Sequence, residues 1–218
     1  MVSGGQFNVA IGHFSAVSGG YYNNATAYYS SISGGGENKA TDESSSVSGR
    51  QSNRASGSYS SVTGGMGNEA DGMHSTVSGG RDNLAGHGDG VTDSEDIESY
   101  ASVSGGESNI ATGLDALVSG GKDNVASGTH ATVAGGINNL ASKSYSAVAG
   151  GHSNKASGRP ATVSGGKKNT SSGNESSVSG GTKNKASDVS SSILDASKKK
   201  ATEKNSVNTG ENSDNNRG

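Results

Sequence analysis

The chain has 218 residues, of which 37 are glycine, one is proline and none is cysteine or tryptophan, and only 28% are hydrophobic. The lack of cysteine excludes a disulfide framework and a thiolate metal site. The near-balanced net charge of −3 argues against nucleic-acid binding, which needs a clustered basic face. No apolar run approaches the about 18 residues that cross a bilayer, so we expect no direct membrane insertion.

A fifteen-residue repeat is the main feature of the sequence. Asparagine follows the repeated valine or isoleucine by six places and alanine follows it by eight, with Ser171 as the exception in the alanine column. A Gly-Gly pair follows by two and three places, with Gly49-Arg50 as a half-break. The valine or isoleucine occurs at positions 2, 17, 32, 47, 62 and 77, and then at 103, 118, 133, 148, 163, 178 and 193. The jump from 77 to 103 is one repeat plus eleven inserted residues.

Each repeat contains two short stretches with period-two alternation, bounded by glycine. In residues 60–64 the Ser, Val and Gly side would face inward, and in residues 68–72 the Asn, Ala and Gly side would do so. Such alternation indicates β-strands. Since every inward residue is small, we predict an all-β fold, a thin parallel β-roll or solenoid with 15-residue coils and two short strands per coil. The asparagine column is interpreted as structural, because stacked amides can bond their neighbours and the turn backbone.

The repeats divide the chain into a roll and a tail. We predict a β-roll of about twelve repeats over residues 1–194, in which a thirteenth coil begins at Ile193 and is abandoned. Residues 195–218 are polar and predicted to be a disordered tail. An acidic loop is expected at the insertion, about residues 86–99. Its carboxylates suit either a solvated loop or, as a weaker candidate, a calcium site: Asp89, Asp93, Glu95, Asp96 and Glu98.

Two sets of outward residues are candidate contact sites. Aromatic rings concentrate near the start of the repeats, where they either form a binding face or merely stack on each other. The candidate binding face comprises Phe14, Tyr21, Tyr22, Tyr28, Tyr29 and Tyr59. In the middle repeats, the position seven after the valine turns from charged to apolar. This apolar stripe is a candidate oligomer interface, formed by Leu84, Ile110, Val125 and Leu140.

Nothing in the sequence indicates catalysis or a cofactor. The five histidines show no metal-ligand spacing, no G-x-S-x-G motif occurs, and a coil of 15 residues does not fit the about 18-residue coils of the acyltransferase solenoids. We therefore expect a protein that is not an enzyme. A structural spacer or fibre rod is the alternative to a binding module, and an ice-binding solenoid is less favoured because the outward columns are richer in serine than in threonine.

The repeat resembles the YadA-like head repeats of trimeric autotransporter adhesins. Asn8-Val9-Ala10-Ile11-Gly12 is similar to that family's N-x-A-I-G coil, and residues 146–158 are similar to its longer variant. The resemblance covers about residues 2–193. It implies a left-handed roll, a homotrimer, and display on a bacterial outer membrane, with a role in virulence through adhesion to extracellular protein or glycan on matrix or host cells. The signal peptide, stalk and membrane anchor of such adhesins are not visible in this sequence.

Overall fold

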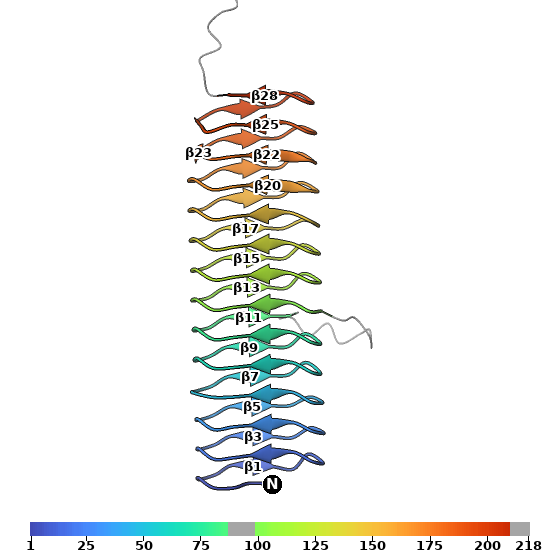
Figure 1. Ribbon diagram of the computed structural model, residues 1–218, viewed down its shortest axis with the longest axis vertical. Helices are drawn as coiled ribbons and strands as arrows, with labels where there is room; N and C mark the ends of the chain where they lie inside the picture. The colour runs from blue at the N-terminus through green and yellow to red at the C-terminus, as the bar shows by residue number, and fades with distance from the viewer. Residues whose placement is uncertain (87–98, 210–218) are drawn as a thin grey trace, which may run out of the picture.

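The computed structural model describes residues 1–86 and 99–209, which form a long rod of stacked coils (Figure 1). Within these residues all regular structure is β, in strands of two or three residues. Each coil contributes one strand to each of two parallel 13-stranded sheets. The predicted all-β solenoid with two short strands per coil is therefore confirmed.

The two large sheets are named here after the residue that most of their strands bury. The alanine sheet consists of β1 (Val9–Ala10), β3 (Asn24–Ala25), β5 (Lys39–Ala40), β7 (Arg54–Ala55), β9 (Glu69–Ala70), β11 (Leu84–Ala85), β13 (Ile110–Ala111), β15 (Val125–Ala126), β17 (Leu140–Ala141), β19 (Lys155–Ala156), β21 (Thr170–Ser171), β24 (Lys185–Ala186) and β27 (Lys200–Ala201). The valine sheet consists of β2 (Ala16–Val17), β4 (Ser31–Ile32), β6 (Ser46–Val47), β8 (Ser61–Val62), β10 (Thr76–Val77), β12 (Ser102–Val103), β14 (Leu117–Val118), β16 (Thr132–Val133), β18 (Ala147–Val148), β20 (Ala161–Val163), β22 (Ser176–Val178), β25 (Ser192–Ile193) and β28 (Val207–Asn208). A small third sheet pairs β23 (Gly181–Thr182) with β26 (Ala196–Ser197).

Each strand pairs with the strand of the next coil, which fixes the register at one repeat. Val62 lies opposite Val77 in the valine sheet. Across the insertion, Val77 lies opposite Val103 in the same way. Pairing therefore resumes in register after the inserted residues, as the jump in the repeat predicted. The candidate calcium ligands Asp89, Asp93, Glu95, Asp96 and Glu98 lie outside the described residues.

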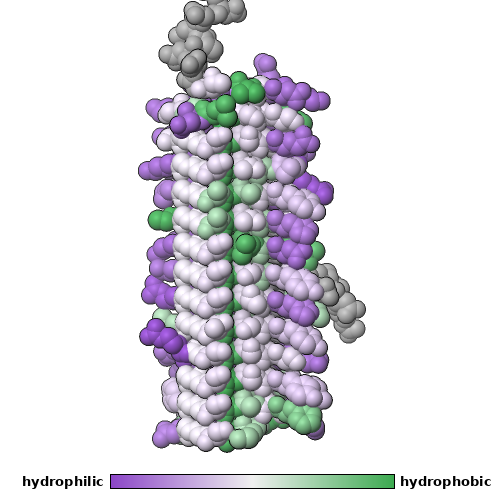
Figure 2. All heavy atoms as spheres, viewed as in Figure 1, coloured by the Kyte–Doolittle hydropathy of each residue, from purple (hydrophilic) through white to green (hydrophobic). Residues whose placement is uncertain are grey.

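The core consists of two rows of small side chains between the sheets. The valine row and the alanine row are almost completely buried, with exposures of 0–1% for members such as Val62 and Ala70. The residue two places before each valine and the asparagine of each coil are buried as well, for example Ser60 and Asn68. Strongly polar side chains gather along the two edges of the rod, where the chain turns from one sheet to the other (Figure 2).

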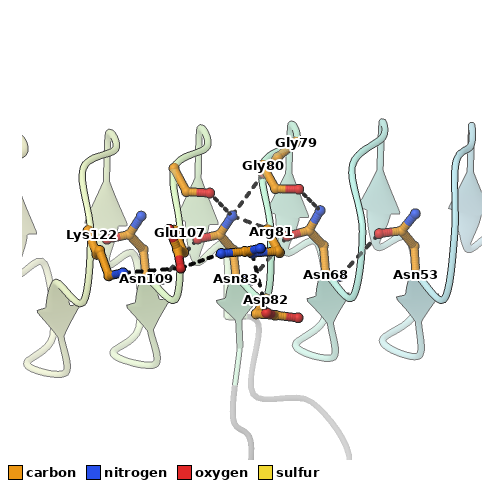
Figure 3. A network of polar contacts seen from close by, with 11 residues as sticks. Asn53, Asn68, Gly79, Gly80, Arg81, Asp82, Asn83, Glu107, Asn109 and Lys122 are labelled. Atoms are coloured by element: carbon orange, nitrogen blue, oxygen red, sulfur yellow. Dashed lines mark hydrogen bonds and ion pairs between the residues drawn. The ribbon is translucent and has the colours of Figure 1, made fainter.

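The asparagine column forms a continuous ladder inside the roll. The backbone N–H of Asn68 donates to the side-chain oxygen of Asn53 at 3.1 Å. The side-chain nitrogen of Asn68 donates to the carbonyls of Gly64 and Gly80, at 2.8 and 3.0 Å. The same pattern continues at Asn83, and Figure 3 shows the asparagines of four successive coils in one row. Because buried amides need partners, this confirms the structural interpretation of the column.

The turns depend on left-handed backbone angles. Gly65 has φ +87°, and a Cβ there would meet the carbonyl oxygen of Gly80 at 2.1 Å, so this corner takes a side chain only with a backbone shift. Two other corner positions are left-handed for many residue types, with Pro160 as the exception. One is three residues before the valine, as at Tyr29 (φ 55°), and the other is five residues after it, as at Tyr22 (φ 52°).

The predicted tail is wrong for residues 195–209, because the roll continues through them. Strands β26, β27 and β28 complete a further coil, in which Ala201 lies opposite Ala186 and Asn208 opposite Ile193. The usual Gly-Gly pair and asparagine are absent from this coil. Lys199 stands at the asparagine position, and its backbone N–H still donates a hydrogen bond to the side-chain oxygen of Asn184 at 3.0 Å. The last coil thus pairs with the preceding coil although it lacks the glycines and the asparagine of the repeat.

Candidate functional site

The six aromatic residues of the expected binding face lie on two edges of the rod. Tyr21 and Tyr22 are in the turn between β2 and β3, whereas Tyr28 and Tyr29 are in the turn between β3 and β4. Since each coil has two strands and two turns, these turns lie at opposite edges. Phe14 and Tyr59 share the edge of Tyr29, each three places before a valine. A single face made of all six is therefore wrong, because half a coil separates the two groups.

The rings of the larger group stack along the rod axis. Phe14 and Tyr29 are stacked with ring centroids 5.1 Å apart, and Tyr28 contacts Tyr29 edge-on at 4.3 Å. Further along the same edge, Tyr59 stacks on His74 at 5.0 Å. This confirms the interpretation that the column rings stack on each other. The rings nevertheless stay about half exposed, so stacking does not remove them from contact with a ligand.

The smaller group borders a groove on the other edge. Tyr22 stacks on Phe7 at 4.7 Å, and Tyr21 packs edge-on against Tyr22 at 4.7 Å. The groove beside them has a volume of about 670 Å³, which is within the usual range of small-molecule sites. It is lined by Tyr21, Tyr22, Glu37, Lys39, Ser52, Asn53, Arg54, Gly67, Asn68 and Glu69. We call it the tyrosine groove.

The groove exists because one corner column loses its side chains. The position five residues after the valine carries Tyr22 and Glu37 in two coils, and then only Ser52 and Gly67 in the next two. The outward position of the alanine sheet keeps long side chains, such as Arg54, and forms the opposite wall. Coils lie about 4.8 Å apart, so the groove runs along the rod across four of them. Its floor is the turn backbone over the asparagine ladder.

Charges in the tyrosine groove are balanced. Glu37 accepts hydrogen bonds from the Tyr21 hydroxyl at 3.2 Å and from Ser52 Oγ at 3.0 Å. Arg54 Nη1 pairs with Glu69 Oε1 at 2.8 Å. The hydrogen bond to Glu37, together with its negative charge, raises the pKa of the Tyr21 phenol above 10.0. The phenol therefore remains a neutral hydroxyl at the mouth of the groove.

The candidate oligomer interface is one continuous row in the structure. Leu84 pairs with Ile110, Ile110 with Val125, and Val125 with Leu140, in four successive coils of the alanine sheet. Their side chains are partly exposed on the outer face of this sheet. Glu69 precedes the row.

A row of ion-paired side chains lies beside this apolar row, on the neighbouring corner. Glu107 accepts hydrogen bonds from Arg81 at 2.5 Å and from Lys122 at 3.2 Å (Figure 3). The hydrogen bond from Arg81, followed by that from Lys122, lowers the pKa of Glu107. All three side chains are exposed, so these ion pairs balance the charge of the surface without forming a polar pocket.

Sequence reasoning missed the polar half of the tyrosine groove. Glu37 and Ser52 belong to one column and Arg54 and Glu69 to another, and the sequence alone gave no reason to group the two columns. The signal was the shrinking of one column from Tyr22 to Gly67, which opens space in any stacked coil.

The described residues contain no group of three or more His, Asp and Glu side chains placed to hold a metal ion. No helix in this part of the chain is long and apolar enough to cross a membrane. No protein-family model matches the sequence, and no curated protein matches it either.

Proposed function

We propose that the protein is a non-enzymatic binding rod, an adhesin-type module whose tyrosine groove holds an uncharged oligosaccharide. The observation that carries this proposal is the groove itself, where the exposed rings of Tyr21 and Tyr22 meet the hydrogen-bonding side chains of Glu37 and Arg54. Aromatic rings contribute a large contact area that binds apolar surface, while their polar ends remain solvated. The C–H face of a sugar ring is such a surface, and its hydroxyl groups match carboxylate and guanidinium partners.

The balanced charge of the groove supports a neutral ligand. Glu37 and Glu69 face Lys39 and Arg54 across the same space, so neither an acidic nor a basic ligand gains from the net field. The direction of the groove also fits a linear ligand. It follows the rod axis over four coils, and successive coils repeat their backbone at about 4.8 Å.

Display outside the cell and assembly into a homotrimer are part of this proposal. They rest on the resemblance of the repeats to adhesin heads. The half-buried row from Leu84 to Leu140 supports assembly, since a contiguous apolar row on a polar rod suits contact with another copy. A structural rod without a ligand is the competing function, and it predicts that no groove variant changes any binding.

A variant that fills the groove tests the proposal. Ser52→Tyr adds a ring at a corner position where Tyr22 already adopts the required left-handed backbone. Ser153→Tyr is the matched control, because Ser153 occupies the same column several coils away. Binding is measured on an array of neutral oligosaccharides and then by calorimetry with the best ligand. We expect Ser52→Tyr and Tyr21→Ser to lower the affinity at least about tenfold, which corresponds to about 1.4 kcal/mol.

The control and the array decide the outcome. Ser153→Tyr should bind as tightly as the unchanged chain. If no neutral glycan binds, or if Ser52→Tyr and Ser153→Tyr lower the affinity equally, the groove is not the binding site. Capture of a folded protein with no dependence on glycan would replace the oligosaccharide by a protein partner.

A further inference from the structure

The last coils carry a charge opposite to that of the rest of the rod. Residues 151–209 contain ten lysine and arginine residues against four aspartate and glutamate residues. Residues 1–150 contain six against fourteen. The net charge of −3 is therefore an average over an acidic part and a basic end. The basic end therefore attracts anionic partners although the whole chain carries a net negative charge.

Six lysines of the basic end lie in two neighbouring rows. One row is on the corner five residues after the valine, where Lys168, Lys183 and Lys198 follow each other in successive coils. Coil-to-coil backbone hydrogen bonds fix this row, since the Lys183 N–H donates to the Lys167 carbonyl at 2.9 Å. The other row is on the outer face of the alanine sheet. All six are exposed, and we call them the lysine ladder: Lys155, Lys168, Lys183, Lys185, Lys198 and Lys200.

The alanine-sheet row is in direct register. Lys185 and Lys200 are partners in neighbouring strands, and Thr170 lies between Lys155 and Lys185. Neighbouring strands lie about 4.8 Å apart, so the side chains of Lys185 and Lys200 leave the sheet one strand spacing apart and carry like charge on one face. Their mutual repulsion is unfavourable in the free rod and is relieved when an anion binds.

The carboxylates of these coils do not neutralise the ladder. Among the described residues, no ion pair within 4.0 Å involves any of its six lysines. Glu175, Asp188 and Glu203 lie in turns at the opposite edge of the rod. Asp195 lies in the turn between β25 and β26, at the edge of the ladder, but forms no ion pair with its lysines. The middle coils differ, because there Glu107 lies between Arg81 and Lys122.

We propose that the lysine ladder binds a linear acidic polysaccharide, one that carries sulfate or carboxylate groups along its length. Lysine is a compact point charge that attracts such groups without the planar geometry that arginine adds. Residues 151–209 contain no Phe, Tyr or Trp, and His152 is their one aromatic ring, so they lack the row of rings on which successive nucleic-acid bases stack. A rod with one or two ammonium groups per coil matches a polymer with repeated single charges, and Thr170 and Thr182 add hydroxyl donors between them.

The test uses the full chain with dextran sulfate, alginate, uncharged dextran and poly(dT) as probes in separate titrations. The test variant changes Lys168, Lys183 and Lys198 to Gln together. The matched control changes Lys122, Lys143 and Lys204 to Gln and so removes the same charge outside both the ladder and the tyrosine groove. A second test variant, Lys185→Gln with Lys200→Gln, lies in a column that accepts apolar residues in other coils. Circular dichroism checks that each variant keeps its β-structure.

We expect dextran sulfate or alginate to bind with an affinity that falls as salt rises, because binding releases condensed counterions. The triple ladder variant should lose about tenfold or more of this affinity and show a weaker salt dependence. The control triple variant should change it less than about twofold. Uncharged dextran should not compete for the ladder.

Three results would overturn the proposal. One is equal weakening in the ladder variants and the control, which would make the effect one of overall charge. Another is the absence of binding to both acidic polysaccharides at low salt. The third is tighter binding of poly(dT) than of dextran sulfate at equal charge concentration, which would assign the surface to nucleic acid. These results are independent of the tyrosine groove, because none of the ladder or control variants changes a residue that lines it.

Discussion

The backbone N–H of Asn109 donates a hydrogen bond of 2.9 Å to the side-chain oxygen of Asn83, although 26 residues separate them in the sequence. Elsewhere in the ladder the same bond joins asparagines 15 residues apart, as it does for Asn68 and Asn53. The ladder thus passes the insertion with the same geometry. The pairing of coils, and not their spacing along the chain, holds the roll together at this turn.

Removing one rung of the ladder is expected to destabilise the roll strongly. Asn68→Ala takes away the donors to the Gly64 and Gly80 carbonyls and the acceptor of the Asn83 N–H. Buried groups without partners cost about 1–3 kcal/mol each, so we expect the free energy of unfolding to fall by about 3 kcal/mol in urea denaturation. Asn24→Ala, on the outer face of β3, is the control and should change it by less than about 0.5 kcal/mol. Equal losses in both variants would contradict a structural ladder.

Removing the insertion is expected to leave the roll intact. The residues on either side of the insertion are held to neighbouring coils. The Gly86 N–H donates a hydrogen bond to the Ala111 carbonyl at 2.8 Å, and the Ser99 N–H donates one to the Met73 carbonyl at 3.1 Å. A deletion of residues 87–97 restores the repeat length and should shift the thermal midpoint by no more than about 3 °C, or roughly 1 kcal/mol. A large loss of stability would show that the insertion supports the coil. A calcium-dependent rise in the midpoint of the complete chain alone would favour the calcium-site hypothesis over a solvated loop.

The repeat predicted the coil because inward positions accept few residue types. A side chain between two close sheets must be small, and it must match its neighbours in the coils above and below. Valine, asparagine and alanine, such as Val62, Asn68 and Ala70, therefore recur in successive coils, and their spacing gives the register directly. The same constraint predicted that the jump from Val77 to Val103 would be absorbed outside the ladder.

Outward and terminal positions are predicted less well, for a physical reason. Solvent accepts almost any side chain, so the small residues Ser52 and Gly67 indicate open space but not which side chains line it. The last coil shows the other limit of sequence prediction. Lys199 occupies the asparagine position there, yet the hydrogen bond from its backbone N–H to the Asn184 side chain still joins it to the previous coil. Aromatic residues seven places apart, such as Tyr22 and Tyr29, looked like neighbours in sequence but lie half a coil apart.

The Tyr21–Glu37 hydrogen bond predicts an alkaline titration that depends on one carboxylate. Ionising Tyr21 would lose this bond and place a phenolate beside Glu37, so the pKa of Tyr21 is raised above 10.0. The contribution of the bond is therefore complete at pH values below 10.0 and is lost as the pH rises through the raised pKa. Glu37→Gln should lower the pKa of Tyr21 toward its ordinary value, measured by the carbon-13 shift of the ring carbon that bears the hydroxyl. Glu69→Gln is the control, and an unchanged Tyr21 titration in Glu37→Gln would contradict the assignment.

The stacked rings at the edge that carries Phe14 and Tyr29 are expected to contribute to stability and not to glycan binding. Tyr29→Ser removes the ring stacked on Phe14 at 5.1 Å. Ser44 holds the same left-handed corner position (φ 52°), so the backbone tolerates serine there. We expect a loss of about 1 kcal/mol or less in urea denaturation and unchanged affinity for the ligand of the tyrosine groove. Tyr29→Phe keeps the ring and should restore stability. A loss of glycan affinity in Tyr29→Ser with unchanged stability would move the binding face to this edge.

Charging the apolar row is expected to separate the chains of an oligomer. Leu84, Ile110 and Leu140 lie on the outer face of the alanine sheet, in the column where Lys39 and Arg54 stand in earlier coils. Lysine therefore fits this position without disturbing the coil.

Changing all three to lysine should give a folded monomer in sedimentation equilibrium, because like charges in consecutive coils repel a second copy of the row. Asn24→Lys adds a charge to the same column outside the row and should leave the assembly intact. If the unchanged chain itself sediments as a folded monomer, the row is not an interface, and its side chains then pack only against their neighbours along the rod.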